Sequence, residues 1–207
     1  MNESGGTSLR SVIGGAILAG STASRMHGIA KGLIQTGECS LMQRLIHQLH
    51  ASRVRECVIV ANHGGPYLNL HLPVVSDLRQ EGIGPLAGIE SGLNYFAERC
   101  HGVLFLSCDL PEITADELNT LIKAFRESTQ PVVFAQTGVD DWHPLCAVAH
   151  VGILSALSAA IDSGERAVRD FWCQVGAVRV PFADETRFFN INRLDDLEQW
   201  RKQTRDS

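Results

Sequence analysis

In the sequence Ile17-Leu-Ala-Gly-Ser-Thr-Ala-Ser-Arg-Met-His-Gly-Ile-Ala-Lys31, an apolar run gives way to small side chains and then to two cations. The run 12–18 predicts a buried first strand. The small side chains of 19–24 leave the backbone N–H groups open to a ligand, and converging N–H groups bind anions well. Because Arg25 and Lys31 follow at fixed offsets, this loop is suited to a polyphosphate.

Two common phosphate-binding motifs are absent from this loop. No Gly-Lys-Ser or Gly-Lys-Thr closes it, so it is not a P-loop. No Gly-x-Gly-x-x-Gly follows the strand, so the dinucleotide fingerprint is also excluded.

The size and composition of the chain predict an ordinary globular protein. Its 207 residues are 44% hydrophobic and 20% charged, and no linker or repeat divides them. We expect a disordered polar tail over 1–10 and a single domain over 11–205. The net charge of −5 argues against a nucleic-acid partner. No run approaches 18 apolar residues, so we expect no membrane span and a cytoplasmic protein.

The six cysteines show no metal-binding or disulfide pattern. No C-x-x-C pair occurs among them, and the expected state is buried, reduced thiols. They stand at positions 39, 57, 100, 108, 146 and 173.

Apolar runs alternate with amphipathic segments along the whole chain. Predicted strands lie at 12–18, 57–61, 72–75, 103–106, 131–135, 145–149 and near 175–180. Predicted helices lie at 41–49 and 114–125 (both opened by capping boxes), at 85–97, around 151–161 and 165–172, and from about 194. This alternation predicts an α/β fold: a single Rossmann-like, three-layer domain with a mostly parallel sheet and helices on both faces.

Two carboxylates stand just after predicted strands, where ligands bind in such sheets. Asp109 follows the strand 103–106, and Asp77 follows 72–75. Asp109 could cap the next helix, but Thr114 is the expected cap, which leaves Asp109 free. A carboxylate opposite an amide-rich loop is where Mg²⁺ bridging phosphates would be held.

The phosphate loop also resembles the signature of a known family. Its residues follow the pattern Leu-Ala-Gly-Gly-x-x-x-Arg-Met-Gly-Gly-x-Asp-Lys-Gly-Leu of the molybdenum cofactor guanylyltransferases, which have a nucleotide-diphospho-sugar transferase-like fold. The matching segments are Leu18-Ala19-Gly20, Arg25-Met26, Gly28 and Lys31-Gly32-Leu33. The resemblance implies that Arg25, Lys31 and Asp109 are catalytic and that Asp109 binds the metal.

Three positions of the loop depart from that signature. Ser21 and His27 replace glycines, and Ala30 replaces the Asp that precedes the lysine. An adjacent carboxylate could tether the lysine, so we expect Lys31 to be less restrained here and the empty loop to be poorly ordered.

The resemblance extends to a turn that begins a helix, Gly84-Pro85-Leu86-Ala87-Gly88. It implies that the nucleotide is bound by Leu18, Ala19, Gly20, Lys31, Asp77, Gly84, Pro85 and Asp109. The Asp77 carboxylate could accept both N1–H and N2–H₂ of guanine, whereas cytosine offers no such donor pair. The family carries an Asn near Val60, but here Asn62 stands two residues later, which leaves that contact open.

Four further residues resemble the family's substrate-binding positions: His143, Arg166, Asn190 and Asn192. Three of them also have a simpler, structural interpretation. His143-Pro144 could be a loop break, and Arg166 a solvated residue at a helix start. We expect Asn192 to be the N-cap of the last helix, with Asp195 in its first turn. Asn190 has no such structural reason.

The resemblance implies transfer of GMP from Mg·GTP to molybdopterin, or to its molybdenum-loaded form, with release of pyrophosphate. The cofactor would be Mg²⁺, and the partners would be other cofactor-biosynthesis proteins and apo-molybdoenzymes. One alternative is a cytidylyltransferase or another small nucleotidyltransferase with a sugar-phosphate or lactate-type acceptor. The other is a non-catalytic nucleotide or pterin binder, which the departures at 21, 27 and 30 suggest.

Overall fold

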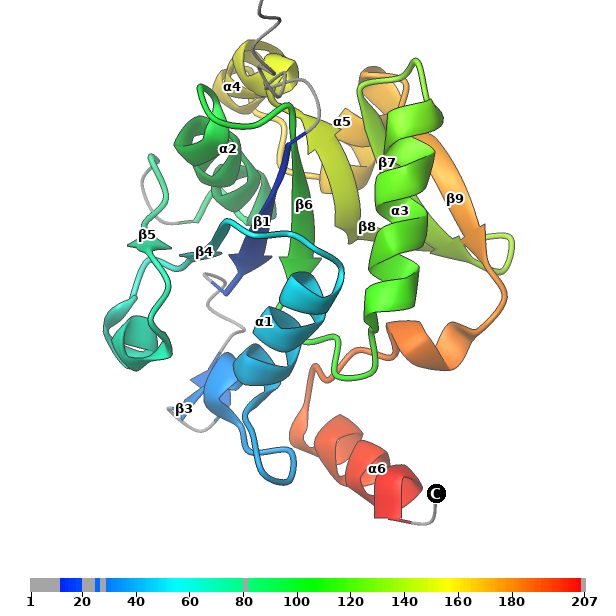
Figure 1. Cartoon of the computed structure of the whole chain (residues 1–207). Helices are drawn as coiled ribbons and strands as arrows, with labels where there is room; N and C mark the ends of the chain where they lie inside the picture. Colours follow the sequence, from blue (N-terminus) through cyan, green and yellow to red (C-terminus); the bar gives the residue numbers. More distant parts are fainter. Residues whose placement is uncertain (1–11, 20–24, 27–28, 80–81, 206–207) are drawn as a thin grey trace, which may run out of the picture.

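The computed structural model describes residues 12–19, 25–26, 29–79 and 82–205 (Figure 1). The expected tail at 1–10 lies outside them. Seven strands form one sheet in the order β5-β4-β1-β6-β8-β7-β9. They are β1 (Ile13–Leu18), β4 (Cys57–Val60), β5 (Val74–Val75), β6 (Gly102–Ser107), β7 (Val132–Thr137), β8 (Asp141–His150) and β9 (Val178–Phe182). All neighbours are parallel except that β8 runs against β6 and β7, which confirms the mostly parallel sheet.

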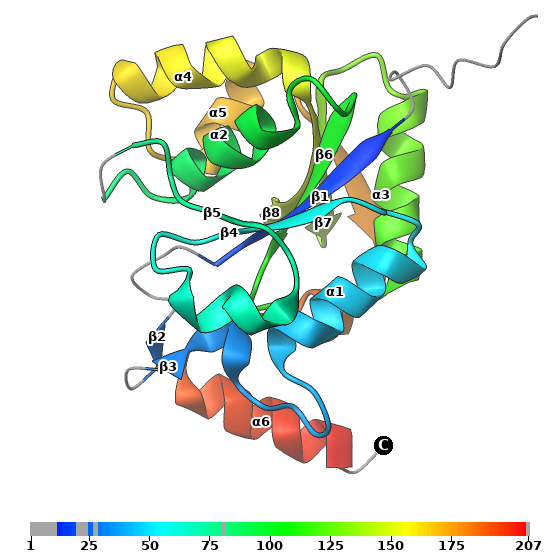
Figure 2. The ribbon, with the colours of Figure 1, turned by 60° about the vertical axis from the view of Figure 1, so that its left-hand side comes forward.

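Helices cover both faces of this sheet, so the predicted three layers are present (Figure 2). One face carries α2 (Pro85–Phe96), α4 (Leu154–Asp162) and α5 (Val168–Gln174), and the other carries α1 (Leu41–Ala51) and α3 (Ala115–Glu127). A small hairpin of β2 (Arg25–Met26) and β3 (Ile29–Ala30) precedes the segment on which the last helix, α6 (Leu194–Arg205), packs, because Leu197 and Trp200 share a core cluster with Ile34. The described residues also form four 3₁₀ helices that were not predicted: η3 (Lys31–Leu33), η4 (Gly65–Leu70), η5 (Val151–Ile153) and η6 (Glu185–Phe188).

The core follows the alternation of side chains along the central strands. Ile17 and Leu104 face α1 and α3, whereas Ala16 and Phe105 face α2 and α4. Two glycines let α2 lie close to the sheet. A Cβ at Gly14 would come within 2.7 Å of the Phe96 ring, and one at Gly92 within 2.7 Å of the Phe105 ring.

The predicted helix starts are confirmed where a capping box marked them. Ser40 and Gln43 exchange side-chain and backbone hydrogen bonds at the start of α1, and Thr114 and Glu117 do so at the start of α3. Asp109 is therefore not needed as the cap of α3.

The structure corrects the interpretation of His143-Pro144 as a loop break. Both residues lie inside β8, which begins four residues before the predicted 145–149. The register shifts here, because Phe134 pairs with Ala147 and the next residue, Ala135, pairs with His143. Pro144 falls in this bulge, where its missing N–H costs no ladder hydrogen bond.

The last predicted elements are displaced along the chain by a few residues. The helix predicted at 165–172 begins only at Val168, after Gly164 adopts a φ of 99°. The strand predicted near 175–180 runs from 178 to 182. No helix of the described ranges has the length and apolar character that crossing a bilayer requires.

All six cysteines are free thiols, and four of them are buried. Burial raises the pKa of the Cys57 and Cys108 thiols to about 12 and that of Cys100 to about 11. These thiols are therefore protonated and unreactive at neutral pH.

Candidate active site

The ends of two adjacent strands bring distant segments together at the carboxyl edge of the sheet. Leu18, at the end of β1, pairs with Ser107 at the end of β6. The Leu18 carbonyl accepts a hydrogen bond from the Cys108 N–H at 3.1 Å, and Ala19 N–H donates to the Val60 carbonyl at 2.8 Å. The phosphate loop and Asp109 therefore begin from neighbouring points, as the strand-end argument predicts.

Lys31 is the centre of the contacts at this edge. Only 3% of the residue is exposed. Its Nζ lies 3.4 Å from Asp109 Oδ2 and 3.4 Å from Asn192 Oδ1. Three residues that the sequence marked by three separate arguments thus meet in one cluster. Both distances exceed those of strong charged hydrogen bonds, which leaves the ammonium able to bind a ligand anion as well.

Tyr67 packs against the turn that carries Lys31. The sequence analysis did not identify this residue. A Cβ at Gly32 would lie 3.1 Å from the Tyr67 ring and 3.0 Å from Met42 Cε, so only a glycine fits without adjustment. Tyr67 is 1% exposed, and burial raises the pKa of its hydroxyl to about 12. The aromatic residue lies in η4, for which the sequence carries no pattern.

The Asp109 carboxylate has an unused acceptor. Its Oδ1 is buried and has no hydrogen-bond partner among the described residues. The backbone is held in place, because the Asp109 carbonyl accepts from Ile191 N–H at 2.9 Å. Further along this loop, Arg44 Nε donates to the Pro111 carbonyl at 3.2 Å, and Trp200 Nε1 donates to Glu112 Oε1 at 2.6 Å. A fixed, buried carboxylate oxygen without a donor is suited to a cation.

The expectation that Ala30 leaves Lys31 less restrained stays a prediction, but the structure shows contacts of the lysine that the sequence did not indicate. Ala30 precedes η3 and makes no side-chain cap, but Asp109 and Asn192 hold the lysine from two other segments. These contacts come from residues 78 and 161 positions away in the sequence. The expectation that the empty loop is poorly ordered concerns residues 20–24 and 27–28, which lie outside the described residues.

The expectation that Asn192 is the N-cap of α6 is wrong. Its side-chain oxygen accepts from Lys31, and the helix begins two residues later. Asp196 takes over at the helix start, because its Oδ2 accepts from the N–H groups of Asn192 and Arg193 at 2.7 Å each. Asp195 does lie in the first turn, as predicted. The side chain of Asn192 is thus directed to the site, while Asn190, two residues before it, is half-buried.

Asp77 follows β5, which is separated from β1 by β4, and Asn62 holds it. Asn62 Nδ2 donates to Asp77 Oδ2, and Asp77 N–H donates to Asn62 Oδ1, each at 2.8 Å. The Asn that stood two residues from its expected place therefore fixes the carboxylate. A Cβ at Gly88, in the first turn of α2, would lie 3.3 Å from Leu18 Cδ2 and 3.7 Å from Asp77 Oδ1. The exposed Gly84 and Pro85 begin this helix.

His143 lies in a compact polar cluster on β7 and β8. The buried Thr137 hydroxyl donates to Asp141 Oδ2 at 2.6 Å, and its oxygen lies 2.8 Å from His143 Nε2. The imidazole stacks on Phe188, with ring centroids 4.7 Å apart. Burial lowers the pKa of His143, although the nearby Asp141 carboxylate opposes this shift.

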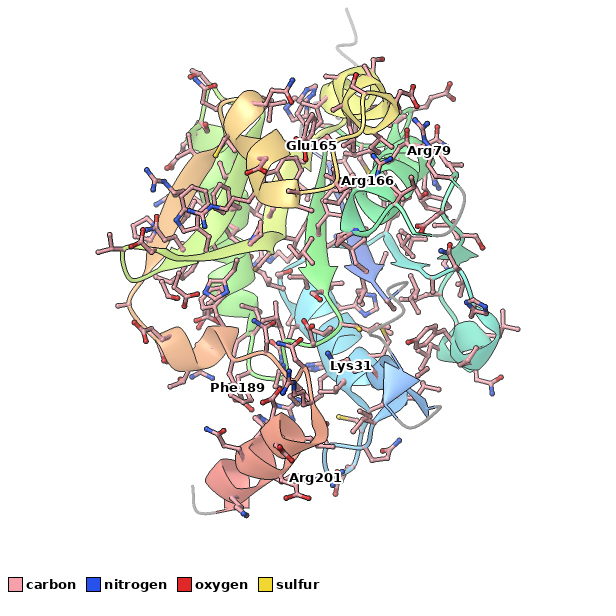
Figure 3. The ribbon with its side chains drawn as sticks, turned by 180° about the vertical axis from the view of Figure 1, so that it is seen from behind. Lys31, Arg79, Glu165, Arg166, Phe189 and Arg201 are labelled. Atoms are coloured by element: carbon pink, nitrogen blue, oxygen red, sulfur yellow. The ribbon has the colours of Figure 1, made fainter. Side chains whose placement is uncertain are left out.

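Arg166 is not joined to the Lys31 cluster by any contact of the described residues. Its Nη1 donates to the carbonyls of Ile161 and Glu165, at 2.9 and 2.6 Å. Figure 3 shows Arg166 beside Glu165 and Arg79, well apart from Lys31.

Two predicted residues cannot be placed fully. Gly20 lies outside the described residues. The Arg25 backbone pairs with Ala30 in the β2–β3 hairpin, but its side chain is outside the description.

The fold and the edge cluster agree with a family comparison. A family model described as the MobA-like NTP transferase domain matches residues 15–177. This chain belongs to that family. Membership makes it a nucleotidyltransferase and confirms the resemblance that the phosphate loop carries.

Relatives of the same family extend over nearly the whole chain. A molybdenum cofactor guanylyltransferase of Serratia proteamaculans is 31% identical over 92% of this chain and 95% of its own length. One of Yersinia pestis is 32% identical over 93% of this chain and 97% of its own length. The crystal structure of a molybdopterin-guanine dinucleotide biosynthesis protein A from Archaeoglobus fulgidus superposes with a TM-score of 0.75, at 22% identity, over 93% of this chain and 99% of that one. This last likeness shows the fold.

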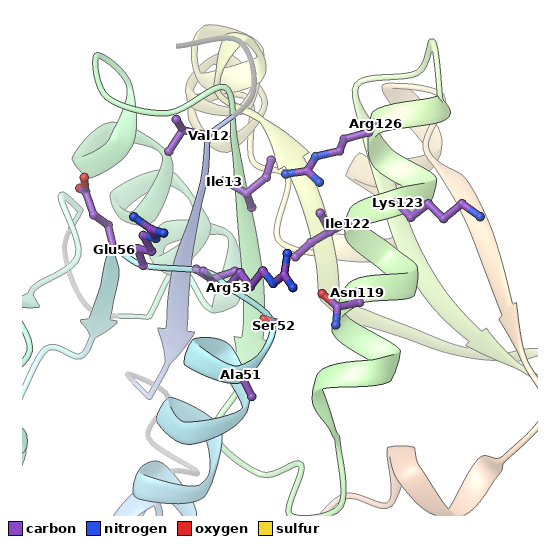
Figure 4. A pocket seen from close by; sticks show the side chains of 12 residues that line it. Val12, Ile13, Ala51, Ser52, Arg53, Glu56, Asn119, Ile122, Lys123 and Arg126 are labelled. Carbon is purple, nitrogen blue, oxygen red and sulfur yellow. The ribbon is translucent and has the colours of Figure 1, made fainter. Parts of the chain in front are cut away.

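A cavity of about 770 Å³ lies at the opposite end of the strands from Lys31 (Figure 4). Its walls come from the start of β1, the segment between α1 and β4, and the last turns of α3. Figure 4 shows Arg53 and Arg126 directed toward its interior. It is therefore separate from the candidate active site.

Proposed function

We propose that the protein transfers GMP from GTP to molybdopterin, or to its molybdenum-loaded form, and so makes the guanine dinucleotide cofactor. The observation that carries the proposal is the Lys31–Asp109 ion pair at the carboxyl edge, where β1, which leads into the phosphate loop, ends next to β6. The names of the relatives support the same activity.

In the proposed reaction, an oxygen of the terminal phosphate of molybdopterin attacks the α-phosphorus of GTP. The new P–O bond forms as the bond from the α-phosphorus to the bridging oxygen breaks, and pyrophosphate leaves with that electron pair. The nucleophile is already an anion, so no general base is required. Catalysis then consists of positioning and charge neutralisation, which Lys31, Arg25 and the loop amides would provide. Arg25 is our candidate for the residue that binds the leaving pyrophosphate.

A divalent metal fits the residues at this edge. Asp109 presents a buried oxygen that lacks a donor, and amide oxygens of Asn190 and Asn192 could add to the shell. No group of three or more His, Cys, Asp or Glu side chains in the described part of the chain could hold a metal alone. Mg²⁺ would thus be held by protein oxygens together with phosphate oxygens, and it would neutralise the charge of the phosphates.

We propose that Asp77 binds the guanine base. The residues proposed to bind the molybdopterin acceptor are His143, Arg166, Asn190 and Asn192. Asn62 forms hydrogen bonds with the carboxylate and the backbone N–H of Asp77. The carboxylate is therefore held in one orientation, which supports its proposed role of accepting hydrogen bonds from guanine N1–H and N2–H₂. Asn192 supports the acceptor assignment because its side chain already touches Lys31. The partners would be later proteins of cofactor assembly and the receiving apo-molybdoenzymes, in the cytoplasm.

A competition assay tests this function. Wild-type protein with Mg²⁺ and molybdopterin is given GTP, CTP and ATP at equal concentrations, and pyrophosphate and each dinucleotide are measured. We expect GTP to be preferred, and Asp77→Asn to reduce this preference about tenfold through a lost charged hydrogen bond. The exposed Asp140→Asn is the matched control.

The assay also separates the alternatives. A preference for CTP would identify a cytidylyltransferase. Tight GTP or molybdopterin binding without any pyrophosphate release would identify a non-catalytic binder and refute the proposed reaction.

A further inference from the structure

Residues 77–79, here called the strap, follow β5 and are anchored at every position. Asp77 is held by Asn62. The next N–H, of Leu78, donates to Ser91 Oγ on α2 at 2.9 Å. Arg79 then reaches a carboxylate of the same helix, Glu90. The strap is therefore tied to both the end of β4 and the body of α2.

Glu90 is an unusual residue for its position, because only 3% of it is exposed in the middle of a helix. Arg79 meets it with two parallel hydrogen bonds, from Nε to Oε2 at 2.8 Å and from Nη2 to Oε1 at 2.7 Å. Ser158 Oγ donates to the same Oε1 at 2.6 Å. The Arg79 guanidinium lowers the pKa of Glu90, which burial alone would raise. A carboxylate at this depth is tolerated because the fork of Arg79 matches it.

The same guanidinium also reaches α4. Its Nη1 is paired with Asp162, the last residue of that helix, and its Nη2 donates to the Ser158 carbonyl at 3.4 Å. The chain then turns and arrives at Arg166, whose Nη1 bonds back to the Ile161 carbonyl at 2.9 Å. In Figure 3, Arg79 and Arg166 are found in the same part of the molecule. One side chain thus connects the strap with the segment that carries Arg166.

We propose that Arg79 and Glu90 are positioning residues that couple the nucleotide-binding strap to the acceptor-binding segment after α4. This inference rests on the proposed function, in which Asp77 binds the base and Arg166 the acceptor. Glu90 orients the guanidinium from the buried side, and the guanidinium ties position 79 of the strap to α2 and to the end of α4. Asp77 is two residues before Arg79 in the same strap, which Asn62 holds at its other end. Neither residue touches a substrate.

Hydrogen exchange on the ligand-free protein tests the coupling without any substrate. Glu90→Gln keeps the shape of the side chain but removes the charge that orients Arg79. We expect it to raise exchange about tenfold in two separate segments, 75–79 and 161–167. Leu157→Ala is the control, because it removes a fully buried side chain from α4 without touching the ion pairs. It should loosen α4 but not the strap.

Asp162→Asn cuts only one arm of the connection. It should raise exchange at 161–167 and leave the strap protected as in wild type. The inference is overturned if hydrogen exchange in the strap is as slow in Glu90→Gln as in the Leu157→Ala control. It is also overturned if Glu90→Gln loosens the strap but not 161–167.

Steady-state kinetics with GTP and molybdopterin supply the functional readout. Glu90→Gln should raise the KM of both substrates about tenfold, while kcat stays within about twofold of wild type. Asp162→Asn should raise only the KM of molybdopterin, and Arg79→Lys should recover part of the loss in Arg79→Ala. Unchanged KM values in a folded Glu90→Gln protein would refute the coupling. If wild type itself makes no dinucleotide, the proposed function fails, and the exchange result still decides the inference.

Discussion

Lys31 is the residue on which the candidate site depends, because its ammonium group contacts both a carboxylate and an amide oxygen. The lysine, Asp109 and Asn192 were each marked by a position after a strand or by a motif, and the structure brings all three into contact. That Asp109 and Asn192 both contact the lysine was not predictable, because they lie 78 and 161 positions away. Glu90 carried no signal at all, since its burial becomes tolerable only when Arg79 is seen to reach it.

Lys31→Ala should reduce both stability and activity. Removing one partner of a buried ion pair costs roughly 3–5 kcal/mol, and the 17% exposure of the Asp109 side chain places this case at or below the lower end. The KM for GTP should rise because the phosphates lose a cation. Urea unfolding and steady-state kinetics measure the two effects. Lys123→Ala, at a side chain that is 76% exposed, is the control. A Lys31→Ala protein that matches this control in both measurements would contradict the assigned role.

Among the elements, β8 shows where prediction from the sequence stops. Its apolar half, 145–149, has an evident strand pattern, but 141–144 contains a His-Pro pair that is typical of a loop. The bulge opposite Phe134 and Ala135 lets the strand continue past the proline. Such a bulge depends on pairing with β7 and leaves no local pattern in the sequence. The helices with capping boxes were predictable because their start signals are local.

His143, on this strand, should make stability depend on pH. Burial lowers its pKa in the folded state below the usual 6.5, so the unfolded chain takes up the proton first as pH falls. Stability from this residue is complete above pH 6.5 and is lost below it, by at most about 1.4 kcal/mol per pH unit. Urea unfolding of wild type and His143→Gln between pH 7.5 and about 5 measures the difference. Equal slopes for the two proteins, with His47→Gln as an exposed control, would show that His143 is not the cause.

For the whole molecule, the decisive feature is that the loops after the parallel strands β1, β5 and β6 leave the sheet at one edge. The mostly parallel order of these strands was predictable from the alternation of apolar runs and helices, and it places the phosphate loop, Asp77 and Asp109 together. A protein of net charge −5 must meet a polyphosphate with local cations, and Lys31 is buried at that point. The connection from Arg79 to α4 could not be predicted, because it joins three elements through side chains alone.

The most direct test of the account is pyrophosphate release by Asp109→Asn. The protein is incubated with Mg²⁺, GTP and molybdopterin, and its folding is checked by thermal unfolding and circular dichroism. Wild type is expected to release one pyrophosphate for each dinucleotide formed. In a folded Asp109→Asn protein, kcat should fall on the order of 10²–10³, the loss expected for about 3–4 kcal/mol of transition-state stabilisation. Pyrophosphate release by folded Asp109→Asn at the wild-type rate would contradict the assignment of nucleotidyl transfer to the Lys31–Asp109 site.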